Sequence, residues 1–176
     1  MNIITIILIE DKLNLPLDIV RYINSFLNKP LNDTRIRIAV ELWFLNQDEC
    51  IKIYGHISDW NVFNVTNISN LFEERTTFNE DISRWKVDNV TDMSSMFYNA
   101  ISFNQDLNSW NTSNVRNMSH IFYMNLKFNQ DLNRWNISPV LNMNNMFCKC
   151  KNIKKNPTKW KISKVKNKCN IFDNDI

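Results

Sequence analysis

The eight residues FNQDLNSW, 103 to 110, recur as FNQDLNRW at 128 to 135 and, more loosely, as FNEDISRW at 78 to 85. Each copy ends in a tryptophan, and this tryptophan belongs to a series in which successive members are 25 residues apart: Trp60, Trp85, Trp110, Trp135 and Trp160. Self-similarity at a fixed period of this size is typical of stacked repeats. The sequence therefore predicts a repeat protein in which neighbouring copies bury a shared core.

Apolar residues keep the same period. The fifth residue after each tryptophan is always valine, and the twelfth is always phenylalanine: Phe72, Phe97, Phe122, Phe147 and Phe172. The eighth residue is apolar in the first four copies and is Lys168 in the fifth, as expected of a terminal repeat that caps the stack. We expect the five tryptophans and the first four of these phenylalanines to form the structural core.

One repeat is predicted to contain a short helix and a short strand. In VTDMSSMFYNA, residues 90 to 100, Met93, Met96 and Phe97 have the i, i+3, i+4 spacing of one helix face. The residue before the first methionine is Asn or Asp in every copy, a preferred N-cap: Asn67, Asp92, Asn117, Asn142 and Asn167. The following segment, 103–107, is short and extended in character, and we predict it to be a strand.

Polar residues would form rows along such a stack. If repeats lie about 5 Å apart, Asp81, Asp106 and Asp131 become a row of like charges. This row must be solvated, hydrogen-bonded to backbone N–H groups that fasten a turn, or bridged by a cation. A parallel asparagine row would either satisfy loop backbone groups or face a partner. We take these rows and their neighbours as the candidate interaction face: Asn79, Glu80, Asp81, Asn104, Gln105, Asp106, Asn129, Gln130 and Asp131.

Over residues 56 to 172 the repeat, for example WNTSNVRNMSHIFYMNLKFNQDLNRW, closely resembles that of the BspA-like leucine-rich-repeat surface proteins. The resemblance implies an α/β, leucine-rich-repeat-like solenoid with one short helix and one short strand per 25-residue repeat, whose role is to bind other macromolecules. Such repeats occur in bacterial surface lipoproteins and adhesins, in protists and in large DNA viruses. The abundance of Asn, Ile and Lys fits an AT-rich genome.

The N-terminal region, 1–55, is predicted to be a helical cap on a solenoid that spans 56–176. A stripe of Ile36, Ile38, Ala39, Leu42 and Trp43 would cover the first repeat. Residues 13 to 43 also resemble an F-box, which implies binding to the Skp-type adaptor of a ubiquitin ligase; the alternative is a second capping helix that starts at a proline. The residues that match the F-box opening are Leu15, Pro16, Ile19, Ile23, Phe26 and Leu27.

Neither an enzyme nor a cofactor is expected. His56 and His120 occupy unrelated repeat positions, and the single glycine leaves no Gly-rich phosphate loop. The four cysteines are expected to be free thiols; Cys148 and Cys150 could bind zinc, but they occupy positions that vary between repeats. The leading hypothesis is a non-enzymatic protein–protein interaction module, and the alternatives are an F-box-type substrate adaptor and a surface adhesin.

Charge and hydropathy bear on partners and location. Residues 151 to 168 contain eight lysines and no acid, which indicates a solvated end of the stack or an anionic partner. Nucleic acid is not the expected partner, because Trp160 is the only aromatic residue in this run. The start, MNIITIILIEDK, has no basic residue before its short apolar run, so we expect no signal peptide, no membrane span and an intracellular protein.

Overall fold

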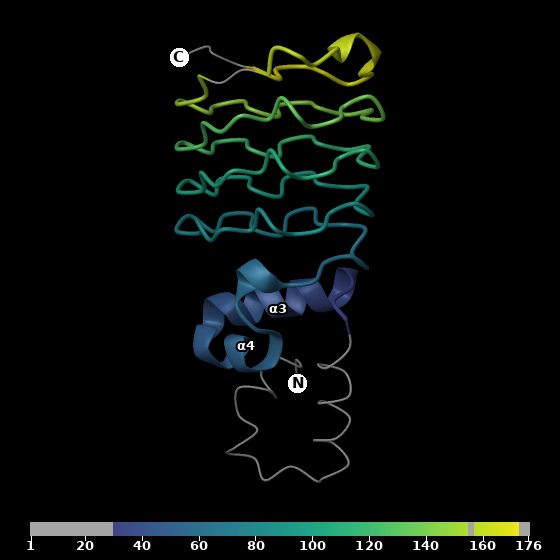
Figure 1. Cartoon of the computed structure of the whole chain (residues 1–176). Helices are drawn as coiled ribbons and strands as arrows, with labels where there is room; N and C mark the ends of the chain where they lie inside the picture. The colour runs from purple at the N-terminus through teal and green to yellow at the C-terminus, as the bar shows by residue number, and fades with distance from the viewer. Residues whose placement is uncertain (1–29, 155–156, 173–176) are drawn as a thin grey trace, which may run out of the picture.

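The computed structural model describes residues 30–154 and 157–172. Two helices, α3 (Asp33–Leu45) and α4 (Gln47–Tyr54), lie at one end of a stack of coils (Figure 1). Two 3-10 turns, η1 (Ile57–Asp59) and η2 (Ile162–Lys164), lie near the two ends of the stack. A coil is defined here as the residues from one tryptophan to the next: 61–85, 86–110, 111–135 and 136–160, with a last, partial coil from 161.

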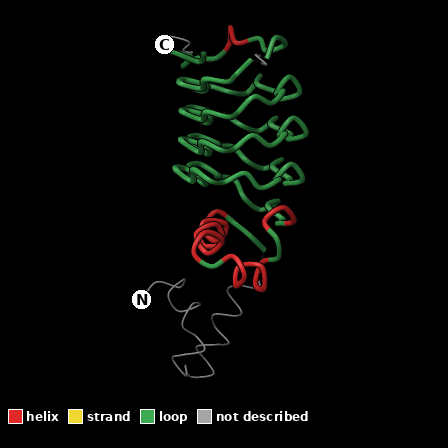
Figure 2. Tube along the Cα trace, turned by 90° about the vertical axis from the view of Figure 1, so that its left-hand side faces the viewer, coloured by secondary structure: helices red, strands yellow, loops and turns green. Residues whose placement is uncertain are grey.

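The prediction of an α/β solenoid with a helix and a strand in each repeat is wrong. No β-strand occurs in residues 30–154 and 157–172, and the only α-helices there are α3 and α4, which precede the coils (Figure 2). Residues 93–97, predicted to be helical, form turns, and residues 103–107, predicted to be a strand, are irregular. The coils themselves are held in parallel by isolated bridges that join Asn67, Asp92, Asn117, Asn142 and Asn167.

Alternating hydrogen bonds explain why the segment is neither helix nor strand. Met96, Tyr98 and Ala100 donate their N–H groups three residues back, to carbonyls of the same coil. The intervening Met93, Ser95, Phe97 and Asn99 donate theirs at 2.8–3.0 Å to carbonyls of the next coil. Ser95 and Asn99 have φ of 55° and 52°, which neither regular element accommodates. The apolar spacing therefore indicated burial correctly, since Met93, Met96 and Phe97 are buried, but not the backbone conformation.

The predicted N-caps have a related local role. Asp92 Oδ1 accepts hydrogen bonds from the N–H and hydroxyl of Ser94, at 2.8 and 2.7 Å. Asn67 and Asn117 bond Ser69 and Ser119 in the same way. These side chains close an Asx turn. They accept a backbone N–H as a helix N-cap does, but turns and not a helix come after them.

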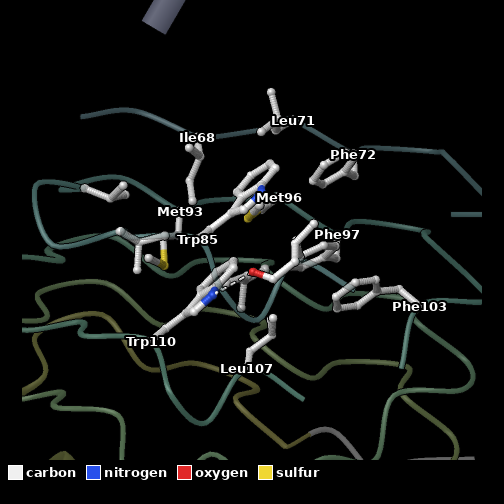
Figure 3. Close-up of a cluster of buried hydrophobic side chains, with 14 of the residues drawn as sticks. Ile68, Leu71, Phe72, Trp85, Met93, Met96, Phe97, Phe103, Leu107 and Trp110 are labelled. Carbon is white, nitrogen blue, oxygen red and sulfur yellow. Dashed lines mark hydrogen bonds between the residues drawn. The ribbon is translucent and has the colours of Figure 1, made fainter. Parts of the chain in front are cut away.

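Aromatic columns run through the core (Figure 3). Phe72, Phe97, Phe122, Phe147 and Phe172 stack with centroid distances of 5.7, 5.5, 5.5 and 5.2 Å. A second column of Phe78, Phe103 and Phe128 lies beside it, 3.8–3.9 Å away within each coil. The columns tie each coil to the next by ring contact as well as by hydrogen bonds.

The tryptophans also join the coils, and the rings of Trp85, Trp135 and Trp160 lie 6.0–6.4 Å from rings of the first phenylalanine column. Trp85, Trp110, Trp135 and Trp160 each donate Nε1–H to a carbonyl 28 residues earlier, in the preceding turn of chain, at 2.8–3.2 Å. Trp60 and Trp85 stack at 6.1 Å, and Trp110 and Trp135 at 6.3 Å. Buried tryptophan N–H groups need such partners, so one side chain supplies both apolar contact and a polar link.

Helix α3 lies across the first coil. Within the stack, the N–H groups of Thr91 and Asp92 donate to the Thr66 carbonyl of the preceding coil. The first coil has no preceding coil, and Asp33 Oδ1 takes this role by accepting from the N–H groups of Thr66 and Asn67 at 2.7 and 3.0 Å. A carboxylate on α3 thus imitates the missing backbone carbonyl.

Apolar packing reinforces this junction. Trp43 of α3 contacts Trp60 edge-on at 6.1 Å, and Phe44 contacts Phe78 at 5.9 Å. The single glycine, Gly55, ends α4 with φ of 75°, a value that favours glycine. The chain can therefore turn from α4 into the first coil.

Candidate interaction face

The asparagines of the predicted face form an internal ladder. Asn79 Oδ1 accepts the N–H of Asn104 at 2.9 Å, and Asn104 Oδ1 accepts that of Asn129 at 2.9 Å. Asn129 Oδ1 then accepts the N–H of Lys154 at 2.8 Å. The asparagine side chains therefore accept hydrogen bonds from loop N–H groups, which is the first of the two alternatives predicted for this row.

The neighbouring glutamines and aspartates are used similarly. Gln105 and Gln130 donate to the carbonyls of Asn79 and Asn104 at 2.7 and 2.8 Å. The aspartates each accept the N–H two residues ahead at 2.8–2.9 Å, an arrangement that closes a turn: Asp81, Asp106 and Asp131. Glu80 differs, since its carboxylate lies 3.9 Å from the ring of His56.

The aspartate row therefore has hydrogen-bond donors of its own. Hydrogen bonds from the hydroxyl and the N–H of Ser83 hold the pKa of Asp81 below its usual value. Within the residues that the structure describes, no group of three or more His, Cys, Asp or Glu side chains could hold a metal ion.

A second surface, which we call the turn face, follows the ladder of alternating hydrogen bonds. Four side chains of this face form one contact group around Tyr123: Tyr98 stacks on its ring at 4.9 Å, His120 lies 5.7 Å away and the Lys149 ammonium 5.4 Å from the ring centre. Asn145 extends the group through a 2.9 Å contact with His120 Nε2. Tyr98, Tyr123 and His120 are half-buried, and Lys149 is exposed.

The turn face varies from coil to coil, whereas the predicted face does not. Its positions hold three series of residues in coil order: Asn70, Ser95, His120 and Asn145; Glu73, Tyr98, Tyr123 and Cys148; Glu74, Asn99, Met124 and Lys149. The predicted face repeats Phe, Asn, an acid or amide, and Asp almost unchanged. The sequence analysis missed the turn face because it searched for residues that repeat. The signal for this face was that its residues vary from one repeat to the next.

Cys50 and Cys150 are buried thiols within the packed structure. Cys150 is buried and donates to the Phe122 carbonyl at 2.6 Å, and burial raises its pKa to about 12. Cys50 is bonded to the Ala39 carbonyl, and burial likewise raises its pKa to about 12. A protonated thiol is a poor nucleophile and a poor metal ligand, so the raised pKa of Cys150 is unfavourable for a zinc ligand at this position.

The F-box-like residues lie outside the described part of the chain: Leu15, Pro16, Ile19, Ile23, Phe26 and Leu27. Their predicted contact with a Skp-type adaptor stays a prediction. No helix among residues 30–154 and 157–172 is long and apolar enough to cross a lipid bilayer.

A family model matches residues 43–160, from the tryptophan of α3 to the tryptophan that ends the fourth full coil. Its description reads "Mycoplasma protein of unknown function, DUF285". The chain belongs to this family. Comparison with curated proteins and with solved structures gave no match. Since the family description names no activity, the DUF285 match does not decide whether the chain is a BspA-like protein.

Proposed function

We propose that this DUF285 chain is a non-enzymatic protein-interaction module that recognises its partner through the turn face. The observation that carries the proposal is the contrast between two surfaces of the same repeat. The polar side chains of the predicted face bond within the stack, while the side chains of the turn face vary along the stack, with tyrosine shared by the two central coils.

Chemistry of the turn face fits recognition of a protein. Tyrosine is enriched at the energetic centres of protein interfaces, because it brings a large apolar area and a hydroxyl at low entropic cost. Tyr98 and Tyr123 are parallel within 7°, and their coils are fixed by hydrogen bonds at every second residue. A partner would therefore meet aromatic groups that are already ordered, which lowers the entropy lost on binding.

Affinity capture with the whole chain, followed by a binding titration with the captured partner, tests the proposal. The variant Tyr98→Ser with Tyr123→Ser is expected to weaken binding by about 30-fold or more, the scale of a hot-spot residue. The matched control, Phe63→Ser with Leu141→Ser, removes two side chains that are 53% and 41% exposed elsewhere. It should leave binding within about twofold, and circular dichroism would verify the fold of every variant.

A third variant, Gln105→Ala with Gln130→Ala, tests the face predicted from sequence. If it abolishes binding while the tyrosine variant binds normally, recognition belongs to that face and the turn-face proposal is wrong. If no partner responds to any of the three variants, the interaction-module proposal itself fails. The adaptor and adhesin alternatives stay predictions, since none of the described residues distinguishes them.

A further inference from the structure

A basic hollow lies between the fourth coil and the last partial coil. Its volume is about 300 Å³. Asn136 and Ser138 line it from one side and Lys161 and Lys164 from the other, while Trp160 and Lys159 lie where the chain passes from one coil to the next. The hollow is thus a gap between repeats, and Asn133 and Trp135 at the end of the third coil complete its lining.

Three lysines line this hollow. Lys159, Lys161 and Lys164 are exposed, and none forms an ion pair with a carboxylate of the described residues. Two arginines elsewhere on the chain behave differently, since Arg75 pairs with Glu41 and Arg84 with Asp59. The hollow therefore offers positive charge that is available to a ligand.

Trp160 adds an aromatic wall. Trp135 and Trp160 both line the hollow. Trp85, Trp110 and Trp135 are only 2–3% exposed, whereas Trp160 is partly buried and so exposes more of its ring. Its Nε1–H is already bonded to the Leu132 carbonyl at 3.2 Å, so the ring is held in place. A fixed aromatic ring beside cations is the combination on which an unpaired nucleobase stacks while its phosphates meet the ammonium groups.

We propose that the hollow binds single-stranded nucleic acid. Phosphates would contact Lys159, Lys161 and Lys164, and one base would stack on Trp160, with the amide of Asn136 beside it. From sequence alone nucleic acid was not the expected partner, because one aromatic residue in a lysine-rich run says little. The structure adds that this ring and these lysines share one concave site.

The cations beside the hollow are of a type that can bind phosphate. All eight basic residues from 151 to 168 are lysine. Lysine binds phosphate as a point charge, whereas the planar fork of arginine binds carboxylate and phosphate alike. A concave site with an aromatic wall also suits an unstacked base better than a paired one, because bases in a duplex keep their faces covered.

Fluorescence anisotropy with fluorescein-labelled 12-nucleotide oligo-dT and oligo-U tests the proposal on the full chain. Three phosphate contacts predict a slope of about −2 for log affinity against log salt, hence about 100-fold weaker binding at 200 mM than at 20 mM NaCl. Replacing Lys159, Lys161 and Lys164 by glutamine should remove most of this dependence. A control with the same change of net charge, Lys52, Lys86 and Lys127 to glutamine, should retain it.

The aromatic contact has its own variants. Trp160→Leu should weaken binding by about five- to 150-fold, the range measured for lost base stacking, while Trp160→Phe should bind within a few-fold of the native chain. Melting curves of both variants would show that the fold is retained. No saturable binding at 20 mM NaCl, equal losses in the two lysine variants, or native affinity in Trp160→Leu would each overturn the proposal. So would tighter binding to a duplex of equal length or to phosphatidylserine vesicles.

Discussion

Truncation of Trp110 to alanine is expected to lower the free energy of unfolding by about 3–5 kcal/mol, as for other buried aromatic side chains. Trp110 is 2% exposed, donates Nε1–H to the Ile82 carbonyl at 3.2 Å and stacks on Trp135 at 6.3 Å. Its removal therefore loosens a central coil from both neighbours at once. At about 2–4 °C per kcal/mol for a chain of this size, the melting temperature should fall by at least about 6 °C.

The matching change at the end of the stack should cost less. Trp160 is only partly buried; its Nε1–H bonds to the Leu132 carbonyl at 3.2 Å, and its ring lies 6.4 Å from the Phe147 ring. We expect Trp160→Ala to lower the free energy of unfolding by about 1–3 kcal/mol. A third variant, Trp110→Phe, keeps an apolar ring but leaves the Ile82 carbonyl without its donor, which typically costs about 1–3 kcal/mol.

Thermal unfolding followed by circular dichroism, with urea titrations of the same variants, gives these values. The expected order of stability is Trp110→Phe above Trp110→Ala, with Trp160→Ala also above Trp110→Ala. Equal melting temperatures for Trp110→Ala and Trp160→Ala would refute the reasoning, because a central ring in contact with both neighbouring coils could not then matter more than a terminal one.

Three more changes test other parts of the stack. Asn104→Leu deprives the N–H of Asn129 of its acceptor and should lower the free energy of unfolding by about 1–3 kcal/mol. Asn104→Asp keeps an oxygen at that position and should lose less stability. Urea titrations in which both variants lose the same free energy of unfolding would contradict the ladder. Ser95→Val forces a β-branched residue to φ of 55° and should cost about 1–2 kcal/mol, while Ser95→Gly should not destabilise; native stability of the valine variant would count against this strain. Burial alone would raise the pKa of Asp33, but hydrogen bonds from Thr66 and Asn67 outweigh it and hold the pKa below its usual value. The stabilisation by ionised Asp33 is therefore present above about pH 4 and is lost as the pH falls through the lowered pKa. The difference in unfolding free energy between the native chain and Asp33→Asn should shrink between about pH 5 and pH 2. A constant difference across that range would show that Asp33 does not titrate in this way.

The sequence was sufficient to show which residues meet across repeats. A 25-residue period places Trp110 beside Trp135 and Phe97 beside Phe122 whatever the backbone does between them. It also placed Asn104 next to Asn79, where the ladder is found. The register of residues along a stack depends only on the number of residues between equivalent positions, and this number can be counted in the sequence.

Backbone conformation was not predictable by the same means. Met93, Met96 and Phe97 face the core in a run of turns, and an amphipathic helix would give the same apolar spacing. The positive φ of Ser95 and Asn99 decides between the turns and a helix. Neither residue type indicates a positive φ as strongly as glycine does. The basic hollow was not predicted either: the period places Asn136 beside Lys161, but spacing alone does not show that the side chains leave a space between the coils.

The alternating bonds that join successive coils have a mechanical consequence. Each coil is attached to the next by a row of N–H to carbonyl bonds and by stacked rings, and the described residues of the coils, 61–154 and 157–172, contain no α-helix or β-strand to carry load along the chain. Tension applied at the end of the stack would therefore peel off one coil at a time rather than break the whole structure at once. Each 25-residue coil would release about 80–90 Å of extended chain, so a force trace should show evenly spaced steps.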